Sequence, residues 1–537
     1  MHEAILSLHG VTFAYRDSEI LALRDVNLRI EEGQFVLVVG PSGSGKSTLL
    51  RTVNGLVPHF SGGRISGNVR VAGHDPIAEG PHAMSPMVGF VHQDPESQFV
   101  VDRVEDELAF AMENQGLPQA LMQARIEEVL TQLNMTHLRQ RRITTLSAGE
   151  KQRVAIGSVL TLQPQVLVLD EPTSQLDPQA AEEVLITCRQ LNRDLGLTVV
   201  LSEHRLERVV QHADRVIYLP ALDEPPASGK PREMLMQIPF APPLVQLAKA
   251  LHWEPIPLTI EAAQPFCTEL QLRPVKRRSR QHPEATCIEV RDLWYDYHGI
   301  EALRGLNLRA GPGELIALMG RNGSGKTTLL KHLVGLLCPK RGEVRINGSD
   351  TRQVSIDALI EHVGYVPQDP SSLLFADTVR QELEFTRRAH GLPPVDTNLW
   401  LTRLGLAGLA ERYPRALSVG ERQRAALAAI LVAEPSVLLL DEPTRGLDPG
   451  EKEALADFLR QQTTQGRTVV LATHDVELAA QAAQRVVILD RGRVLADGPA
   501  REVMSLSEEF SPQVSRLFRD PWLLTAQDVM EARSSES

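Results

Sequence analysis

Features that the sequence lacks exclude several classes of protein. The chain of 537 residues has no apolar run of about 18 residues or more, so we expect no membrane-spanning helix. Residues Met1–Gly10 do not place a basic region before a long apolar stretch, so we expect no secretory signal. The cysteines are few, scattered and without a Cys-x-x-Cys pair: Cys188, Cys267, Cys287 and Cys338. We interpret them as reduced residues rather than zinc ligands, an iron–sulfur site or disulfides.

The charge balance argues against a general affinity for nucleic acid. The net charge is −12, which repels a phosphate backbone. A basic run at Lys276–Arg280 is the exception, and we interpret it as a solvated linker. Apolar residues make up 42% and charged residues 23% of the chain, as in soluble globular proteins. The length exceeds what one hydrophobic core supports, so two or more domains are expected.

Two motifs occur twice, in the same order, about half a chain apart. Gly40–Thr48 recurs as Gly320–Thr328, and Val168–Thr173 recurs as Leu439–Thr444. The spacing between matching residues shrinks along the chain, so the first copy carries small insertions, one of them near residues 58–63. A repeat on this scale predicts two homologous domains, and a function that needs two nucleotide sites facing each other.

The repeat extends into C-terminal tails. Pro243–Leu247 and Pro257–Thr259 resemble Pro512–Leu517 and Leu524–Thr525. We therefore predict a first domain over residues 1–265, a linker over 266–284 and a second domain over 285–537. A flexible linker of this length spans roughly 25 Å and holds its partner at an effective concentration on the order of millimolar. We expect the two halves to pair within one chain.

Continuous apolar runs alternate with helical patterns in each half. The runs cover 35–39, 166–169 and 198–201 in the first copy, and 315–319, 437–440 and 468–471 in the second. Such runs are typical of buried parallel strands. Helical patterns follow, for example over 47–54 and 180–195. The predicted fold class is α/β, with a mostly parallel core sheet flanked by helices.

The glycine-rich segments match G-x-x-x-x-G-K-[ST] between a strand and a helix, the context that phosphate binding requires. Glycines let backbone N–H groups turn around the phosphates, and the helix N-terminus adds positive potential. Lys46 and Lys326 are expected to reach the β- and γ-phosphates, while Ser47 and Thr327 offer hydroxyls to Mg²⁺. A glycine-rich turn without a ligand is the alternative, which the two complete copies disfavour. The predicted loop residues are Gly40, Pro41, Ser42, Gly43, Ser44, Gly45, Lys46, Ser47, Thr48, Gly320, Arg321, Asn322, Gly323, Ser324, Gly325, Lys326, Thr327 and Thr328.

An Asp-Glu pair ends an apolar strand in each copy. We interpret Asp170 and Asp441 as partners of Mg²⁺, and the adjacent Glu171 and Glu442 as general bases for the attacking water. A helix cap or a solvated charge is the alternative. The position after a strand and before Pro-Thr favours the catalytic interpretation.

With these motifs in place, the chain resembles ATP-binding-cassette (ABC) ATPases over nearly its whole length. Leu146–Glu150 and Leu417–Glu421 are similar to the signature sequence of that family. Further matches are the Q-loop glutamines Gln93 and Gln368, the switch histidines His204 and His474, the adenine-stacking aromatics Tyr15 and Tyr297, and the D-loop aspartates Asp177 and Asp448.

The resemblance implies two cassettes, each with a mostly parallel core sheet, an antiparallel β part and a helical subdomain. It implies MgATP hydrolysis with Glu171, Glu442, His204, His474, Gln93 and Gln368 as catalytic residues. The implied Mg²⁺ partners are Ser47, Gln93, Asp170, Thr327, Gln368 and Asp441. It further implies composite sites, in which ATP on Lys46 meets Ser418 and Gly420, and ATP on Lys326 meets Ser147 and Gly149.

Two departures from the family pattern are present. The signatures have Ala148 and Val419 where a first glycine is usual, and Glu150 and Glu421 where glutamine is common. The D-loops also differ, reading Ser-Gln-Leu-Asp177 and Arg-Gly-Leu-Asp448. Neither change removes a general base or a histidine. We expect both sites to hydrolyse ATP, at unequal rates.

The segment after the first Q-loop resembles the ATPase subunits of energy-coupling-factor transporters. It runs through His92–Phe99, Val104–Phe110 and Glu113–Pro118, with a looser counterpart at Pro367–Pro370 and Thr378–Phe385. The resemblance implies a membrane scaffold subunit, docked in grooves lined by 93–99 and 368–375, and a separate membrane subunit that binds a vitamin or metal ion. The chain would act at the cytoplasmic face of the membrane, with no nucleic acid partner.

Two other functions remain open. A soluble twin-cassette translation factor normally joins its halves by a long, charged helical linker, whereas this linker is short and contains Pro274 and Pro283. A fused sugar-importer ATPase commonly has one degraded catalytic site, whereas Glu171 and Glu442 are both present here. Coiled-coil DNA-repair cassettes are excluded, because the chain has no long heptad insertion.

Overall fold

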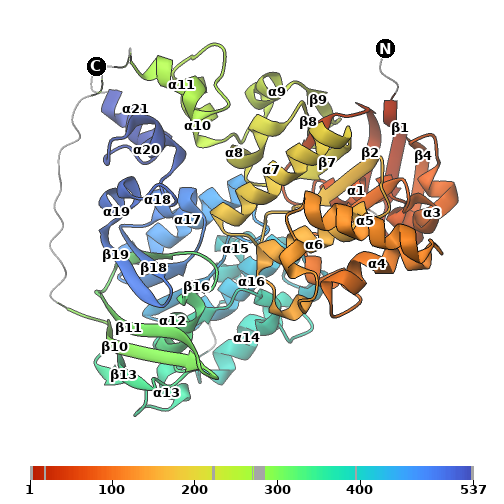
Figure 1. Ribbon diagram of the computed structural model, residues 1–537. Coiled ribbons are helices and arrows are strands. Elements are labelled where there is room, and N and C mark those ends of the chain that lie inside the picture. Colours follow the sequence, from red (N-terminus) through yellow and green to blue (C-terminus); the bar gives the residue numbers. More distant parts are fainter. Residues whose placement is uncertain are drawn as a thin grey trace. The chain divides into compact units, whose positions relative to one another are not determined.

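The computed structural model describes residues 4–16, 20–220, 224–268, 270, 272, 285–393 and 396–533 (Figure 1). Contacts divide the chain into two compact units, Met1–Val245 with Trp253–Thr259, and Gln246–His252 with Ile260–Ser537. Most of the expected linker, including the basic run at 276–280, lies outside the described residues, so the domain boundary stays a prediction. Within the described ranges, none of the helices combines the length and the apolar character that crossing a membrane demands.

A six-stranded sheet, as far as the chain is described, forms the core of the first unit, in the order β5-β6-β7-β3-β8-β9. The strands are β5 (Val88–Val91), β6 (Val166–Asp170), β7 (Thr198–Ser202), β3 (Phe35–Val39), β8 (Arg215–Tyr218) and β9 (Ala227–Gly229). All neighbours pair in parallel except β8 and β9. Residues of β3, β6 and β7 are buried throughout, which explains the apolar runs 35–39, 166–169 and 199–201 and confirms the predicted strands.

A smaller antiparallel sheet completes the β structure described in this unit. Its order is β2-β1-β4, with β1 (Ala4–Ala14), β2 (Leu21–Glu31) and β4 (Arg64–Val71). Alternate residues of β2 are buried, as expected for a strand with one face on the core. The two sheets share one hydrophobic cluster, to which Phe13 and Val38 both belong.

Helices cover the core sheet and form a separate subdomain. In that subdomain α4 (Val104–Asn114) packs against α5 (Gln119–Gln132) and α6 (Ala148–Leu160), drawn in orange in Figure 1. The other helices and 3₁₀ turns of the described N-terminal half are α1 (Lys46–Val53), α2 (Leu56–His59), α3 (Pro76–Met84), η1 (Pro95–Ser97), η2 (Thr136–Leu138), η3 (Ile143–Thr145), α7 (Pro178–Leu195), α8 (Leu206–Val209), η4 (Val210–His212), α9 (Pro231–Gln237), α10 (Pro243–Ala250) and α11 (Ile260–Cys267).

The second unit repeats this topology. Its core sheet has the order β15-β16-β17-β12-β18-β19, and its antiparallel sheet the order β11-β10-β13-β14. The core strands are β15 (Val363–Val366), β16 (Val437–Asp441), β17 (Thr468–Ala472), β12 (Leu315–Met319), β18 (Arg485–Asp490) and β19 (Arg493–Pro499). The antiparallel strands are β10 (Ile288–Tyr297), β11 (Ile300–Ala310), β13 (Arg341–Ile346) and β14 (Ser349–Asp350).

Helices of the second unit follow in the same order as in the first. They are α12 (Lys326–Leu333), α13 (Ile356–Ile360), η5 (Pro370–Leu373), α14 (Val379–Ala389), α15 (Asn398–Arg403), η6 (Ala407–Leu409), η7 (Pro414–Ala416), α16 (Val419–Leu431), α17 (Pro449–Thr464), α18 (Val476–Ala482), α19 (Ala500–Leu506), α20 (Gln513–Phe518) and α21 (Ala526–Arg533). The two predicted cassettes and the α/β fold class are thus confirmed. Contacts group α11 with the second unit, where it packs against α20.

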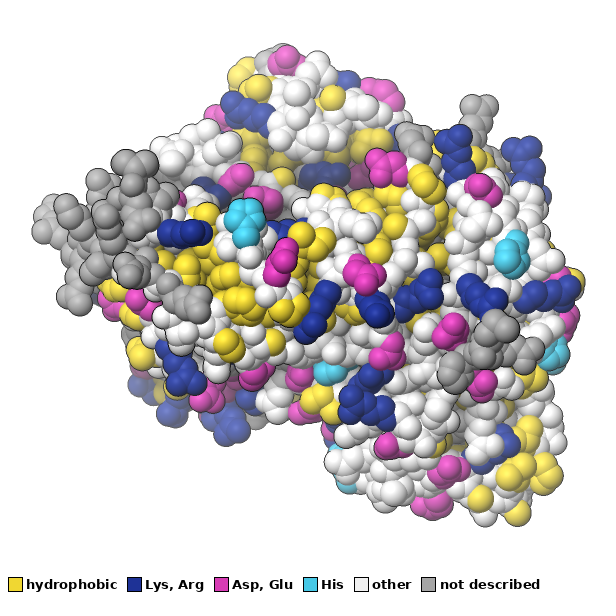
Figure 2. Space-filling model, turned by 90° about the horizontal axis from the view of Figure 1, so that it is seen from above, with side chains coloured by type: hydrophobic (Ala, Val, Ile, Leu, Met, Phe, Trp, Pro, Cys, Tyr) yellow, Lys and Arg dark blue, Asp and Glu magenta, His cyan; other side chains and the backbone are white. Residues whose placement is uncertain are grey.

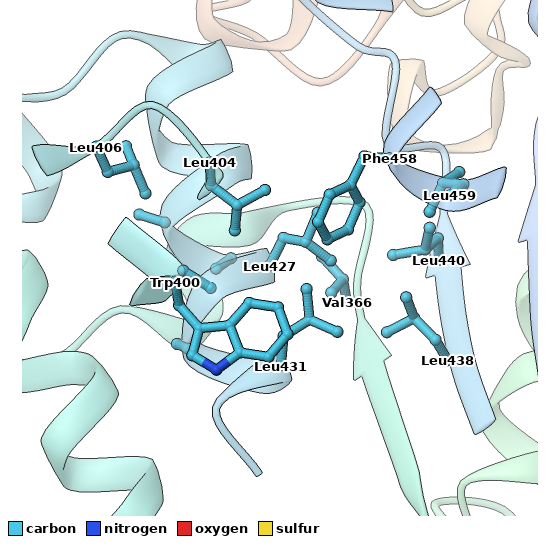
Figure 3. Close-up of a cluster of buried hydrophobic side chains, with 14 of the residues drawn as sticks. Val366, Trp400, Leu404, Leu406, Leu427, Leu431, Leu438, Leu440, Phe458 and Leu459 are labelled. Atoms are coloured by element: carbon cyan, nitrogen blue, oxygen red, sulfur yellow. The ribbon is translucent and has the colours of Figure 1, made fainter. Parts of the chain in front are cut away.

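The core strands of the second unit bury both faces, each against a different cluster. Leu438 and Leu440 of β16 point into a cluster with Trp400, Leu427 and Phe458 from the helices (Figure 3). Val437 and Leu439 of the same strand belong to the cluster under the antiparallel sheet. Because side chains alternate along a strand, this two-sided burial explains why Val437–Leu440 are all apolar, with Asp441 only at the end of the strand.

Candidate functional site

The first glycine-rich loop connects β3 to α1 and holds its lysine at the helix start. Lys46 is buried, and its Nζ donates to the carbonyl oxygens of Gly40 and Pro41, both at 2.9 Å. A Cβ atom at Gly40 would collide with the Leu219 carbonyl oxygen, and Gly45 has a φ of 93°. These close approaches explain why glycine occupies both positions.

The second loop, between β12 and α12, repeats this geometry with one addition. Lys326 Nζ donates to Gly320 O at 2.7 Å and to Arg321 O at 3.2 Å. The Arg321 guanidinium forms a bidentate ion pair with Glu509, with Nε–Oε1 and Nη2–Oε2 distances of 2.9 and 3.0 Å. Glu509 lies between α19 and α20, so the second phosphate loop is tied to the C-terminal tail. The first loop has Pro41 in place of Arg321.

The motif aspartates lie beside the loop hydroxyls. Asp170, at the end of β6, accepts from Ser47 Oγ at 3.0 Å, and Asp441 is hydrogen-bonded to the side chain of Thr327. Burial raises the pKa of both carboxyls, and at Asp170 the neighbouring charge of Glu171 adds to this rise. A hydroxyl and a carboxylate this close form an oxygen donor pair of the kind that Mg²⁺ prefers.

Glu171 is the centre of a buried polar cluster in the first unit. Gln93 Nε2 donates to Glu171 Oε2 at 3.0 Å, and His204 Nε2 lies 2.8 Å from Oε1. The three residues come from the loops after β5, β6 and β7, which neighbour one another in the sheet. Parallel pairing brings the carboxyl ends of these strands to one edge, so residues far apart in sequence meet there.

The second unit brings together the glutamate and the histidine of this set. His474 Nδ1 lies 2.6 Å from Glu442 Oε2, and the His474 backbone N–H donates to the same oxygen at 3.3 Å. The side chain of Gln368 is exposed to solvent. Gln368 therefore differs in environment from the half-buried Gln93, although both follow the strand next to the motif aspartate.

The signature serines are N-caps of long helices. Ser147 precedes α6 and accepts from Glu150 N at 3.3 Å, while Glu150 accepts from Ser147 N at 2.7 Å. Ser418 and Glu421 form the same capping box before α16. The glutamates at these positions thus stabilise the helix start. Gly149 and Gly420 lie against α7 and α17 of their own units, since a Cβ atom would reach Ala180 Cβ or Glu451 Oε1 at 3.0 and 2.7 Å.

The remaining predicted residues are two tyrosines at the ends of antiparallel strands and two aspartates that cap helices. Tyr15 Oη is 2.8 Å from Thr48 Oγ1, which holds the ring next to the first phosphate loop. Tyr297 ends β10, is 38% exposed and packs edge-on against Tyr295. Asp177 and Asp448 are the N-caps of α7 and α17.

The residues present fit a nucleotide and Mg²⁺ in both loops. A buried serine hydroxyl in each loop, Ser44 Oγ and Ser324 Oγ, has no hydrogen-bond partner. An unpaired hydroxyl among inward-turned amides suits phosphate oxygens. In the described chain no group of three or more His, Cys, Asp or Glu side chains is arranged to hold a metal ion. The oxygen donors beside each loop are its Ser47 or Thr327 hydroxyl and the carboxylate of the strand-ending aspartate.

Several residues around this machinery were missed by sequence reasoning. Glu203 is fully enclosed, burial raises its pKa, and it accepts from Thr173 N at 3.0 Å and from His204 N at 3.1 Å. It therefore connects the segment after Glu171 with the switch histidine. Ser202, Tyr365, Glu107, Glu382 and Glu509 also make contacts that no motif indicates. Alignment of the two copies could have drawn attention to Ser202 and Tyr365, since Ala472 and Phe90 occupy the matching positions.

Comparison with known proteins agrees with the geometry. The family model for the ABC transporter matches residues 23–174 and 303–445. A protein of Streptomyces coelicolor described as a "Putative ABC transporter ATP-binding protein" is 45% identical over 98% of this chain and 100% of its own length. A protein of Methanosarcina mazei with the same description is 38% identical over 94% of this chain and 91% of its own length.

Solved structures resemble one or both cassettes. CbiO1 of Clostridium perfringens, part of the ABC transporter complex CbiONQ, is 33% identical and covers 43% of this chain and 96% of its own, with a TM-score of 0.40. The archaeal ribosome recycling factor aABCE1 is 23% identical and covers 92% of this chain and 91% of its own, with a TM-score of 0.58. The second likeness shows a shared twin-cassette fold. The family match and the full-length relatives place the chain in the ABC transporter family, as an ATP-binding component with two ATPase cassettes that use ATP and Mg²⁺.

Proposed function

We propose that the chain is the motor subunit of an energy-coupling-factor type importer. It couples MgATP hydrolysis at two sites between the cassettes to the uptake of a vitamin or metal ion. A membrane scaffold subunit and a membrane substrate-binding subunit carry the cargo, and the chain lies at the cytoplasmic face of the membrane. We assign residues 1–265 and 285–537 to the two cassettes with their C-terminal tails, although contacts group Gln246–His252 and α11 with the second unit.

The observation that carries this proposal is the surface that follows each Q-loop glutamine. The side chains of Val100 and Phe375 are 61% and 74% exposed. The backbone beside each of them is nevertheless held by hydrogen bonds to a buried glutamate. Glu107 accepts from Val100 N and Val101 N at 3.0 and 3.1 Å, and Glu382 accepts from Ala376 N. Exposed apolar side chains on a fixed segment are typical of a surface that binds a partner helix. The residues around them are also those that resemble energy-coupling-factor ATPases.

The chemistry that we assign to the chain's own residues follows from their contacts. Mg²⁺, when bound, neutralises charge on the β- and γ-phosphate oxygens. Ser47 and Asp170 hold the ion in the first site, and Thr327 and Asp441 in the second. Glu171 accepts the proton of the attacking water, and Gln93 and His204 orient its two carboxylate oxygens. Glu442 and His474 do the same in the second site, with Gln368 joining when the site closes.

The two sites are composite in this proposal. Ser418 and Gly420 complete the site of Lys46, and Ser147 and Gly149 complete that of Lys326. Each signature serine begins a helix of 13 residues, whose N-terminal amides attract phosphate charge. Tyr15 and Tyr297 stack on the adenines.

Nucleic acid is not part of this proposal. The net charge is −12, and on the face drawn in Figure 2 the Lys and Arg side chains are interspersed with Asp and Glu. A phosphate backbone is bound by a continuous basic surface.

The test is recovery of partners from native membranes. The tagged wild-type chain and the variant V100S/F375S are each purified in mild detergent. The control is L506S, which changes an exposed leucine of the C-terminal tail instead. We expect the wild-type chain and L506S to recover a polytopic scaffold and a small membrane binding protein, and V100S/F375S to lose them. Recovery of a sugar-type permease would favour the other importer class. Ribosomal proteins in the soluble fraction, without a membrane partner, would contradict the proposal.

A further inference from the structure

The magnesium-binding aspartate of the first site receives a second hydroxyl from the neighbouring strand. Asp170 ends β6, and the register of the sheet places it opposite Ser202 of β7. Ser202 Oγ donates to Asp170 Oδ1 at 2.9 Å, in addition to the bond from Ser47. Both side chains are buried, so this hydrogen bond does not compete with bulk water.

The second site has no hydroxyl at the matching position. Asp441 ends β16 and lies opposite Ala472 of β17 in the same register. Its extra hydroxyl comes from the strand on the other side of β16. Tyr365 of β15 donates from Oη to Asp441 Oδ2 at 3.3 Å. Burial and the charge of Asp441 raise the pKa of Tyr365, which keeps the phenol protonated as a donor.

The first site lacks that phenol in turn. Phe90 of β5 pairs with Val168 of β6, just as Tyr365 pairs with Leu439 of β16. The two copies therefore carry Phe and Ser around Asp170, but Tyr and Ala around Asp441. Besides the hydroxyl of its phosphate loop, each aspartate thus receives one further hydroxyl, and the two come from opposite neighbouring strands.

We propose that Ser202 and Tyr365 are positioning residues for Mg²⁺, equivalent in role although they occupy different positions of the repeat. Each holds a buried carboxylate in its ionised, ligating orientation. Hydrogen bonds to a metal-ligating carboxylate typically change metal affinity by about 10- to 100-fold. Ser202 has one further contact, since its Oγ accepts from Glu171 N at 3.0 Å, whereas Glu442 N bonds to the Ala472 carbonyl.

The experiment measures metal affinity site by site. Lys326→Ala leaves the first site intact and Lys46→Ala leaves the second, and Mn²⁺ binding at saturating ATP is followed by electron paramagnetic resonance. In the Lys326→Ala background, where the first site is measured, we expect S202A to raise the Mn²⁺ concentration at half-saturation about tenfold. Adding F90Y to S202A should reverse most of this rise. In the Lys46→Ala background, where the second site is measured, Y365F should raise the Mn²⁺ concentration at half-saturation to the same extent. Adding A472S to Y365F should reverse this rise.

A matched control removes a hydroxyl from the other end of the same strand. Thr198 is buried and its Oγ1 accepts from Gly33 N at 2.9 Å, so T198V tests loss of a buried hydroxyl without contact to Asp170. Its Mn²⁺ half-saturation should equal that of the background. Y365F keeps the ring in place, so the second site remains measurable if S202A does not fold.

Two results would overturn the inference. One is an unchanged Mn²⁺ half-saturation in Y365F and, where it folds, S202A. The other is a rise that F90Y and A472S do not reverse, which would mean that the hydroxyls of Ser202 and Tyr365 are not equivalent in role. The readout requires only ATP and metal binding, so it does not depend on which membrane partners the chain has.

Discussion

At the scale of single residues, both predicted general bases adopt an uncommon backbone conformation. Glu171 has a φ of 48° and Glu442 a φ of 50°. A non-glycine residue in the left-handed region costs roughly 1–3 kcal/mol and is retained where the surrounding structure requires it. The backbone N–H of Glu171 bonds to Ser202 Oγ, and that of Glu442 to Ala472 O. These bonds fix both carboxylates at the carboxyl edge of the sheet.

The first prediction concerns these two glutamates. E171Q and E442Q, made singly, should each reduce steady-state ATP turnover by the share that its own site contributes, because glutamine accepts no proton from the attacking water. The double variant should fall about 100-fold or more. Phosphate release is the measurement, and E113Q, at the exposed end of α4, serves as the control. If both single variants hydrolyse ATP near the wild-type rate, the base assignment fails.

At the scale of elements, a buried glutamate anchors the segment after each Q-loop to the helical subdomain. Glu107 of α4 and Glu382 of α14 are 4% and 2% exposed. Both accept backbone N–H groups of the segment that carries Val100 or Phe375. Glu107 receives two of these bonds, from Val100 N and Val101 N. In the function proposed above, this anchor connects the helical subdomain to the surface that binds the membrane partner.

The second prediction tests this anchor. E107Q should lower the free energy of unfolding by about 1–3 kcal/mol, because it replaces a charged acceptor and adds a buried amide donor. Hydrogen exchange at Val100 and Val101 should speed up, which mass spectrometry of peptides measures. D106N is the control, since Asp106 is the exposed neighbour on the same helix. Unchanged exchange at these two amides in E107Q would show that the segment is held by other contacts.

At the scale of the whole molecule, the two cassettes stabilise their phosphate loops differently. Pro41 restricts its own φ in the first loop, whereas Arg321 is held by a side chain far along the sequence, in the C-terminal tail. The carbonyl of Arg321 in turn accepts from Lys326 Nζ. The tail therefore takes part in shaping the second ATP site.

The third prediction follows from this contact. E509Q should raise the KM for ATP of the second site about two- to fivefold, with kcat unchanged, because the pair is partly exposed and worth about 1 kcal/mol at most. The measurement uses Lys46→Ala to isolate the second site. The adjacent E508Q removes an exposed charge instead and should leave KM unchanged. The same E509Q change with Lys326→Ala should leave the first site unaffected, and an equal effect there would contradict the prediction.

Sequence alone was sufficient for the family, the α/β class and the two cassettes. Phosphate loops, strand-ending Asp-Glu pairs and N-capped signature segments are local motifs, whose chemistry depends on neighbours in the chain. Continuous apolar runs likewise identified β3, β6 and β7, because burial on both faces favours apolar residues at every position except the strand ends.

Contacts across the sheet were decided by the tertiary structure. Gln93, Glu171 and His204 meet only because their strands are neighbours. The hydroxyls that reach Asp170 and Asp441 in addition to those of the phosphate loops come from β7 in one cassette and from β15 in the other. The anchors at Glu107 and Glu509 connect segments with no shared motif. Sequence patterns report on near neighbours along the chain, whereas these contacts depend on strand order, register and the packing of a tail, which only the folded chain defines.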